Sequence, residues 1–190
     1  MIMMMRLFIA LDIEAAVLER LTALQQKLRQ ATGLGGREVK WVPADQMHLT
    51  LKFLGPVKPD DVPRVCAMAQ ETAGRIAPFE LTCKGVSVFG NPARVVWAGI
   101  DASEVLHKLQ CELDERFTQA GFAAENRGYT AHLTLCRVKS ATAGFALAAA
   151  VEPFAKEAFG TTGVDSLAVY ESRLSADGPE YGVVSRSLLR

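Results

Sequence analysis

The stretch MHLTLKFLG, Met47 to Gly55, contains a tetrapeptide, HLTL, that returns in AHLTLCRVK, Ala131 to Lys139. The two copies lie 84 residues apart (132 − 48), and they contain two of the three histidines in this 190-residue chain. A tetrapeptide that recurs with a rare residue type at the same position points to a duplicated structural unit.

The predicted elements around each copy follow the same order. In the first half, RLFIALDI predicts a strand, and Asp12 can cap the helix that follows it; the HLTL strand, a second helix and the strand FELTCKGVSVFG come next. In the second half, RVVWAGI predicts a strand, Ser103 caps a helix, and the HLTL strand precedes an alanine-rich helix that Pro153 should end or kink. The strands VDSLAVYESRL and YGVVSRSLL complete the chain.

This order predicts an α+β fold with an internal duplication. We expect one domain, residues 1–190, made of two interleaved lobes with approximate repeat units 6–90 and 94–175. The lobes should be related by a pseudo-twofold axis, with antiparallel-rich sheets facing a central cleft and helices outside. The two HLTL strands would then lie on opposite sides of that cleft.

The composition indicates a globular protein without a generally basic surface. Lys and Arg number 21, as do Asp and Glu, so an anionic partner must be bound locally and a protein that coats nucleic acid is disfavoured. The apolar N-terminus is interrupted by Arg6 and Asp12, which predicts a strand and neither a signal peptide nor a membrane span. The four cysteines are isolated, which favours reduced thiols and a cytoplasmic location.

Side chains alternate between the two faces of a strand. The first copy should therefore present His48, Thr50 and Lys52 on one face. The leucines and Phe53 should point the other way, into the core. A His and a Thr at positions i and i+2 are close neighbours on a rigid element, and the second copy should present His132 and Thr134 in the same way.

Two such pairs at one cleft suit attack on a phosphodiester. An imidazole with an ordinary pKa of about 6.5 can act as an acid or a base near neutral pH, so His48 and His132 can divide the two roles. The hydroxyls of Thr50 and Thr134 can donate hydrogen bonds to the non-bridging oxygens of the phosphate.

Other interpretations of the same residues are weaker. A single HLTL strand is more often structural, and it is the second copy that favours catalysis. His107 lacks the threonine partner and is expected to be structural or exposed. No third ligand recurs beside both copies, so no metal site is predicted. The stretch GLGGREVK lacks the ending of a phosphate-binding P-loop and predicts a turn.

The paired stretches resemble the HxTx motifs of the 2H phosphoesterases. Further stretches, RLFIALDI, WVPADQMHLTLKFLG, RVVWAGI, YTAHLTLCRV and VYESRLSADGPEYGVV, resemble the RNA 2',3'-cyclic phosphodiesterase family, also called the 2'-5' RNA ligase family, along nearly the whole chain. The resemblance implies the bilobal fold, an active site in the cleft, and no metal ion or other cofactor. We expect a monomer that binds RNA ends carrying a 2',3'-cyclic phosphate.

The implied activity is hydrolysis of that cyclic phosphate to a 2'-phosphomonoester. Some members also join RNA ends through a 2'-5' linkage. The resemblance implies that His132 is the general base and His48 the proton donor, although pseudo-symmetry leaves the two roles exchangeable. Thr50 and Thr134 would bind the phosphate oxygens.

Two more residues are implied as substrate contacts. Arg137 occupies the HLTLxR position, near the phosphate or the base, but strict alternation places it opposite His132, so a bend is required. Tyr129 precedes the second motif and either stacks on a nucleobase or packs at the lobe edge. Ala131 stands where the family often has proline, which leaves the approach to His132 less rigid.

Two alternative functions stay open. The chain could be a non-catalytic protein that binds RNA ends or nucleotides, in which the His-Thr pairs only bind phosphate. It could also hydrolyse another phosphoester, such as a cyclic nucleotide or 2'-5' oligoadenylate. The motifs contact phosphate and not base, so they do not separate these substrates.

Overall fold

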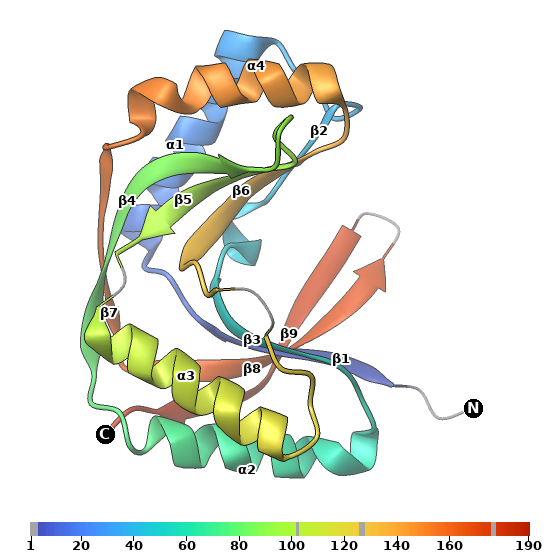
Figure 1. Ribbon diagram of the computed structural model, residues 1–190, viewed down its shortest axis with the longest axis vertical. Helices are drawn as coiled ribbons and strands as arrows, with labels where there is room; N and C mark the ends of the chain where they lie inside the picture. The colour runs from blue at the N-terminus through green and yellow to red at the C-terminus, as the bar shows by residue number, and fades with distance from the viewer. Residues whose placement is uncertain (1–3, 102, 126–127, 176–177) are drawn as a thin grey trace.

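The protein has two antiparallel sheets that face one another, each with helices on its outer side (Figure 1). A computed structural model describes residues 4–101, 103–125, 128–175 and 178–190. The α+β fold predicted from the sequence is confirmed, with two antiparallel sheets and helices outside.

The first sheet contains four strands. In order across the sheet they are β3 (Leu49–Val57), β1 (Met5–Leu11), β8 (Ser166–Ser175) and β9 (Gly178–Leu188). Helices α2 (Val62–Ala73) and α3 (Glu104–Gln119) cover it, and a 3-10 turn, η2 (Pro59–Asp61), leads into α2.

The second sheet contains five strands. In order they are β2 (Val39–Trp41), β6 (His132–Val138), β5 (Val95–Ile100), β4 (Phe79–Phe89) and β7 (Ala158–Val164). Helices α1 (Ala15–Thr32) and α4 (Ala141–Val151) cover it. Two further 3-10 turns lie in the connections: η1 (Ala44–Gln46) precedes β3, and η3 (Glu152–Phe154) contains Pro153, so α4 ends before this proline as predicted.

The two halves of the chain exchange elements. In the first half, β1, β3 and α2 belong to the first sheet, whereas α1 and β4 belong to the second. In the second half the assignment is reversed, because β5, β6 and α4 belong to the second sheet and α3 and β8 to the first. Each sheet is therefore built from both halves. The duplication into units 6–90 and 94–175 stays a prediction.

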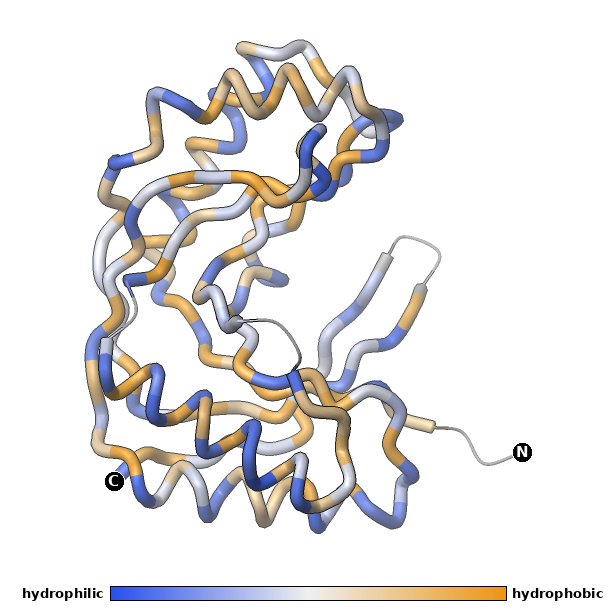
Figure 2. The backbone as a smooth tube through the Cα atoms, in the orientation of Figure 1, coloured by the Kyte–Doolittle hydropathy of each residue, from blue (hydrophilic) through white to orange (hydrophobic). Residues whose placement is uncertain are grey.

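The apolar core lies between each sheet and its helices. The leucines of both HLTL stretches are buried in it, with exposed fractions between 0% and 3%. Figure 2 shows apolar segments along the strands and hydrophilic positions at intervals along α1 and α3. In the described part of the chain, no helix is both long enough and apolar enough to cross a membrane.

Of the two predicted helix caps, Ser103 is confirmed and Asp12 is wrong. Ser103 caps α3, because its hydroxyl accepts a backbone N–H from the first turn at 3.2 Å. Asp12 does not cap α1, so that prediction is wrong. The helix begins after Glu14, and the Asp12 carboxylate instead accepts a hydrogen bond from Tyr170 and pairs with Arg186.

A β-bulge interrupts the alternation of β3 directly after its HLTL threonine. Thr50 and Lys52 pair with consecutive residues of β1, so Leu51 is an extra residue in the ladder. Beyond the bulge the faces are exchanged. The prediction that Lys52 shares a face with Thr50 is wrong: Lys52 is buried, whereas Phe53 is 65% exposed on the cleft side.

An equivalent bulge interrupts β6. Thr134 and Cys136 pair with consecutive residues of β5, so Leu135 is the extra residue. Strict alternation would have placed Arg137 on the face opposite His132. The bulge changes this, and Arg137 lines the cleft. Arg137 is the counterpart of Phe53 (137 − 53 = 84), so the two strands present different side chains at matching positions.

Lys52 uses its buried position to connect β3 to α3. Its ammonium group forms an ion pair with Asp114 and donates to the carbonyl oxygen of Ala123 at 2.6 Å. The Lys52 side chain is only 3% exposed. Removing one partner of such a pair leaves the other charge poorly solvated, which makes the pair important for stability.

We expect Lys52→Met to lower the free energy of unfolding by about 2–4 kcal/mol, because the Asp114 carboxylate loses its cation in a largely buried place. Urea denaturation measures this change. Lys108→Met is the matched control: Lys108 lies 3.9 Å from Glu112, but its side chain is 62% exposed, so its loss should change stability by less than about 0.5 kcal/mol. Equal effects of the two substitutions would contradict the buried ion pair.

Candidate active site

The cleft between the two sheets brings the two HLTL copies together. It has a volume of about 830 Å³, and its lining includes His48, Thr50, His132 and Thr134. Residues 84 positions apart in the sequence (132 − 48) therefore line one cavity. The arrangement predicted for the four motif residues is the one that the structure has.

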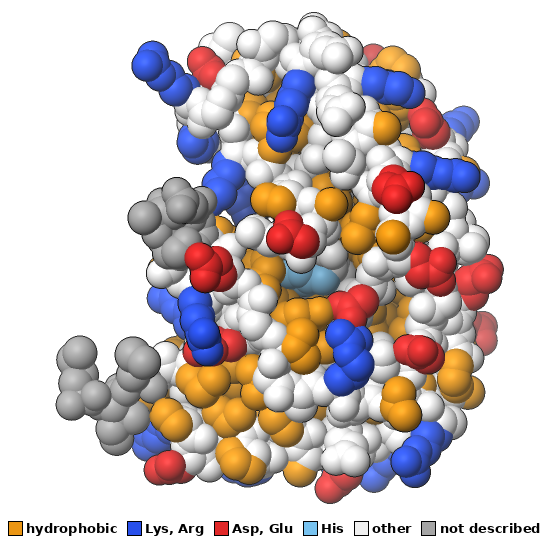
Figure 3. Space-filling model, turned by 180° about the vertical axis from the view of Figure 1, so that it is seen from behind, with side chains coloured by type: hydrophobic (Ala, Val, Ile, Leu, Met, Phe, Trp, Pro, Cys, Tyr) orange, Lys and Arg blue, Asp and Glu red, His pale blue; other side chains and the backbone are white. Residues whose placement is uncertain are grey.

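The walls of the cleft are basic and aromatic. Its cationic side chains are Arg6, Lys40 and Arg137. Its aromatic side chains other than histidine are Phe8, Trp41, Phe53, Phe89 and Tyr181. Among the described residues that line it there is no Asp or Glu. Elsewhere, basic and acidic side chains are interspersed, as on the face in Figure 3, so the cleft attracts anions locally.

Aromatic rings surround the imidazole of His48. It stacks on Phe8 with ring centroids 4.8 Å apart and on Tyr170 at 5.9 Å. Tyr181 meets it edge-on at 5.0 Å. These rings come from β1, β8 and β9, so three neighbouring strands hold the imidazole in one orientation.

This surrounding changes the acidity of His48. Burial lowers the pKa of His48 from 6.5 to about 4, because a charged imidazole is poorly solvated there. A hydrogen bond to the backbone of Gln46 and the negative charge of Asp12 both oppose this effect. In the free protein His48 is therefore neutral at neutral pH.

His132 has a hydrogen bond of the same kind. Its Nδ1 lies 2.7 Å from the carbonyl oxygen of Thr130, two residues before it, as Gln46 is two residues before His48. A carbonyl oxygen only accepts, so Nδ1 carries the proton and Nε2 of the neutral ring keeps a lone pair. Phe89 meets the ring edge-on at 5.0 Å.

Tyr129 lies behind the cleft wall. Its ring packs against the core, and its hydroxyl donates to the backbone carbonyl of Thr50 at 3.1 Å. Burial raises the pKa of Tyr129. The structure thus places Tyr129 where it links the second lobe to β3, and not among the residues that line the cleft, which corresponds to the packing interpretation and not to base stacking.

Several cleft residues could not be found from the motifs. Phe53 was expected in the core because the bulge after Thr50 has no clear signature in the sequence. Lys40 and Trp41 belong to β2, a strand of three residues that lies outside both HLTL motifs. The HLTL repeat offered one usable signal, because Phe53 occupies the position after the first copy that Arg137 occupies after the second.

His107 lies away from the cleft, as expected. It is exposed on α3, where the Sγ atom of Cys111 is 3.5 Å from its Nδ1. Within the part of the chain that the structure describes, no group of three or more His, Cys, Asp or Glu side chains is arranged to hold a metal ion.

The sequence matches a known family along most of its length. The family model described as "LigT like Phosphoesterase" matches residues 11–97 and residues 100–181. The chain belongs to the LigT-like phosphoesterases. The resemblance inferred from the paired motifs is thereby confirmed.

Relatives of this LigT-like phosphoesterase are known in archaea and bacteria. It is 33% identical over 181 residues to a protein of Methanothermobacter thermautotrophicus named RNA 2',3'-cyclic phosphodiesterase, and the match covers 94% of this chain and 96% of the relative. A relative of the same name from Archaeoglobus fulgidus is 32% identical, with 93% and 96% covered.

Solved structures share the fold of this LigT-like phosphoesterase. The structure of TT0787 of Thermus thermophilus has a TM-score of 0.80 and 27% identity, and the match covers 97% of this chain and 98% of that one. The structure of E. coli LigT complexed with 3'-AMP has a TM-score of 0.80 and 25% identity, with 98% of each chain covered.

The lowered pKa of His48 makes stability depend on pH. Below pH 6.5 the unfolded chain binds a proton at this residue, whereas the folded protein binds it only near pH 4. Acid therefore favours unfolding in this window. The free energy of unfolding should fall by up to about 3 kcal/mol from this residue alone as the pH decreases from about 7 to about 4.

Urea denaturation at several pH values, compared between the unsubstituted protein and His48→Asn, measures this contribution. The unsubstituted protein should lose more stability than the variant as the pH is lowered through the window, because an asparagine side chain does not titrate. His107→Asn is the control and should keep the pH dependence of the unsubstituted protein. An unchanged pH dependence in His48→Asn would contradict the desolvation of His48.

Proposed function

We propose that this LigT-like phosphoesterase hydrolyses the terminal 2',3'-cyclic phosphate of RNA to a 2'-phosphomonoester. The observation that carries the proposal is the cleft itself, in which a His-Thr pair from each sheet lies among cations and aromatic rings. The names of the archaeal relatives and the 3'-AMP bound to the E. coli neighbour support a nucleotide with a phosphate at the ribose.

The two threonines would bind the phosphate. In this proposal the hydroxyls of Thr50 and Thr134 donate to the two non-bridging oxygens, one from each side of the cleft. Charge builds on these oxygens in the transition state, so the hydrogen bonds strengthen as the reaction proceeds. Arg137, on the cleft side of the bulge in β6, adds a positive charge nearby.

The two histidines would transfer the protons. His132 takes a proton from water through Nε2, and the water oxygen attacks phosphorus. The bond between phosphorus and O3' breaks, and His48 gives a proton to O3'. The products are a 2'-phosphomonoester and a free 3'-hydroxyl, so the atoms and protons of the substrate and one water are accounted for.

This assignment requires His48 to gain a proton when the substrate binds. The pKa of His48 is about 4 in the free protein, so the residue must be charged by its surroundings in the complex. An anionic phosphate beside the imidazole favours the charged form. The carboxylate of Asp12 acts in the same direction.

The nucleobase would lie between the matching positions of the two strands. Phe53 offers an exposed ring on one side of the cleft, and stacking on an aromatic side chain contributes about 1–3 kcal/mol per base. Arg137 stands at the equivalent position on the other side. A planar guanidinium can also stack on a base, so neither contact selects strongly among the four bases.

The same site could join RNA ends. If a 5'-hydroxyl takes the place of water, the same displacement forms a 2'-5' linkage, and the reverse reaction breaks one. The side chains proposed here supply proton transfer and hydrogen bonding without a metal. The monomeric state and cytoplasmic location expected from the sequence stay predictions.

We expect His48→Ala and His132→Ala each to lower kcat by roughly 10²- to 10⁴-fold, because each removes one proton-transfer group. The measurement is hydrolysis of an oligonucleotide ending in a 2',3'-cyclic phosphate, in the presence of EDTA, with the monoester identified. His107→Ala is the control and should retain full activity. An RNA-end binder would give no turnover, and dependence on a chelated metal would exclude the two-histidine reaction.

A substrate with sulfur in place of O3' separates the acid from the base. A thiolate leaves without a proton, since a thiol has a pKa of about 8.5. His48→Ala should therefore lose less than about tenfold on the sulfur substrate, whereas His132→Ala should lose roughly 10²- to 10⁴-fold on both substrates. The opposite pattern would exchange the two roles.

A further inference from the structure

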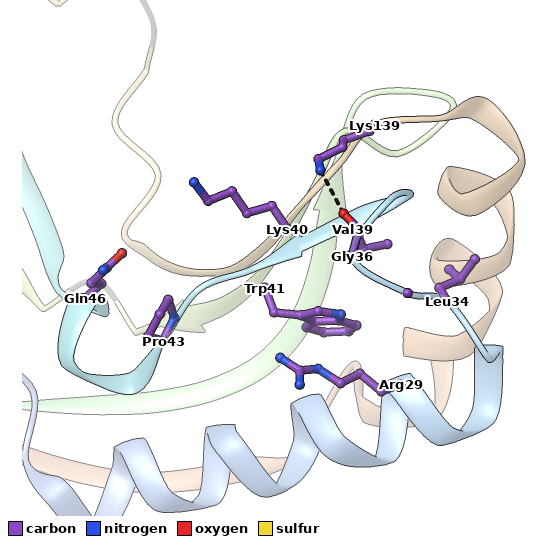
Figure 4. Close-up of a pocket in the computed structure, with 10 residues that line it drawn as sticks. Arg29, Leu34, Gly36, Val39, Lys40, Trp41, Pro43, Gln46 and Lys139 are labelled. Carbon is purple, nitrogen blue, oxygen red and sulfur yellow. Dashed lines mark hydrogen bonds between the residues drawn. The ribbon is translucent and has the colours of Figure 1, made fainter. Parts of the chain in front are cut away.

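A second pocket continues from the cleft around the edge strand β2. It has a volume of about 480 Å³ and shares four lining residues with the cleft: Lys40, Trp41, Pro43 and Gln46 (Figure 4). The second pocket and the cleft are therefore neighbours that meet at β2 and at the segment after it.

The second pocket is basic. Its cations are Arg29, Lys40 and Lys139, and the described residues of its lining include no Asp or Glu. Together with Arg137 these residues are named the basic strip. Between the two pockets, the strip extends from the bulge in β6, over β2, to the end of α1.

Two members of the strip are held in place without losing their charge. The guanidinium of Arg29 lies 5.0 Å from the centre of the Trp41 ring. Such a contact orients the guanidinium plane but leaves its N–H groups available. Lys139 donates one hydrogen bond, 2.8 Å long, to the carbonyl oxygen of Gly36 (Figure 4). No ion pair of Arg29, Lys40 or Lys139 occurs among the described residues.

The strip also contains an unfavourable pair. Lys40 and Arg137 are direct partners in the ladder between β2 and β6. Like charges opposite each other on neighbouring strands destabilise a sheet, and a bound anion removes that repulsion. Both residues line the cleft, so this pair connects the site of the proposed reaction to the second pocket.

The strip exists on one side of the cleft only. β2 is an additional strand at the edge of the second sheet, beside β6. At the corresponding edge of the first sheet, β3 is the outermost strand. The two sheets therefore end differently at the edge where the HLTL strands lie.

We propose that the basic strip binds the RNA strand that precedes the reacting nucleotide. The terminal nucleotide occupies the cleft, and the phosphates before it contact Lys40, Lys139 and Arg29 as the strand passes over β2. In Figure 4, Lys40 extends from one side of β2, whereas Trp41 lies on the other side against Arg29. The RNA strand would therefore pass around the edge of the sheet that β2 forms. This inference rests on the proposed function, because it concerns the same substrate.

The test compares a nucleoside 2',3'-cyclic phosphate with a tetranucleotide that ends in one. The variant combines Arg29→Gln with Lys139→Gln, two residues outside the cleft. Its kcat/KM for the tetranucleotide should fall about tenfold at low salt, because two charged contacts to phosphate are lost. Its kcat/KM for the mononucleotide should not change.

The matched control combines Lys27→Gln with Arg64→Gln, which removes the same charge from exposed positions on α1 and α2 that line neither pocket. This control should keep the activity of the unsubstituted protein on both substrates. If both double variants lose tetranucleotide activity equally, the effect comes from net charge and the proposal is overturned. If neither loses activity, the proposal is also overturned.

Binding supplies a second readout. The tetranucleotide product, with its 2'-phosphate, is titrated into the protein at several salt concentrations. Each phosphate contact on a single strand contributes a slope of about −0.7 to log K against log salt, so Arg29→Gln with Lys139→Gln should reduce the slope by about 1.4. An unchanged slope contradicts the inference. Loss of the proposed function is a separate result, because the unsubstituted protein would then not hydrolyse the mononucleotide.

Discussion

The extra residue after each HLTL threonine decides which side chains reach the cleft. A strand without a bulge would send Arg137 and Phe53 into the core and bring Lys52 and Cys136 to the cleft side, since faces alternate with period two. The bulges exchange the two faces of the strand after the fourth residue of each motif, so Phe53 and Arg137 face the cleft. One insertion thus allows leucines to fill the core while a polar or aromatic side chain joins the His-Thr pair.

The packing around His48 also has an unfavourable effect, because it disfavours the charged form of the imidazole. Aromatic rings hold the imidazole of His48 so closely that its charged form is disfavoured in the free protein. A bound anion can restore the proton. The rigidity that fixes the geometry and the desolvation that suppresses the charge therefore have the same origin, the packing of β1, β8 and β9 around one ring.

The sequence predicted the fold and the meeting of the four motif residues at one cleft, because the HLTL repeat reports on topology. It predicted less well where tertiary contacts decide. The bulges follow from pairing with β1 and β5, and no turn residue marks them. The rings around His48 include Tyr170 and Tyr181, more than 120 residues away in sequence (170 − 48 = 122), so no local pattern connects them to the motif. The capping of α1 by Asp12 failed because Tyr170 and Arg186 bind that carboxylate.

The exchange of elements between the halves has a consequence for how such a chain can be divided. A chain that ended between β4 and β5 would keep α1 but lack β5 and β6, the central strands of the sheet that α1 covers. It would also keep β1 and β3 without α3 on their outer face. Such a half could bury its apolar surfaces only against a second copy that supplied the missing elements, as in a domain-swapped dimer. Because both halves belong to one chain, their assembly does not depend on concentration, and the two sides of the cleft can carry different residues.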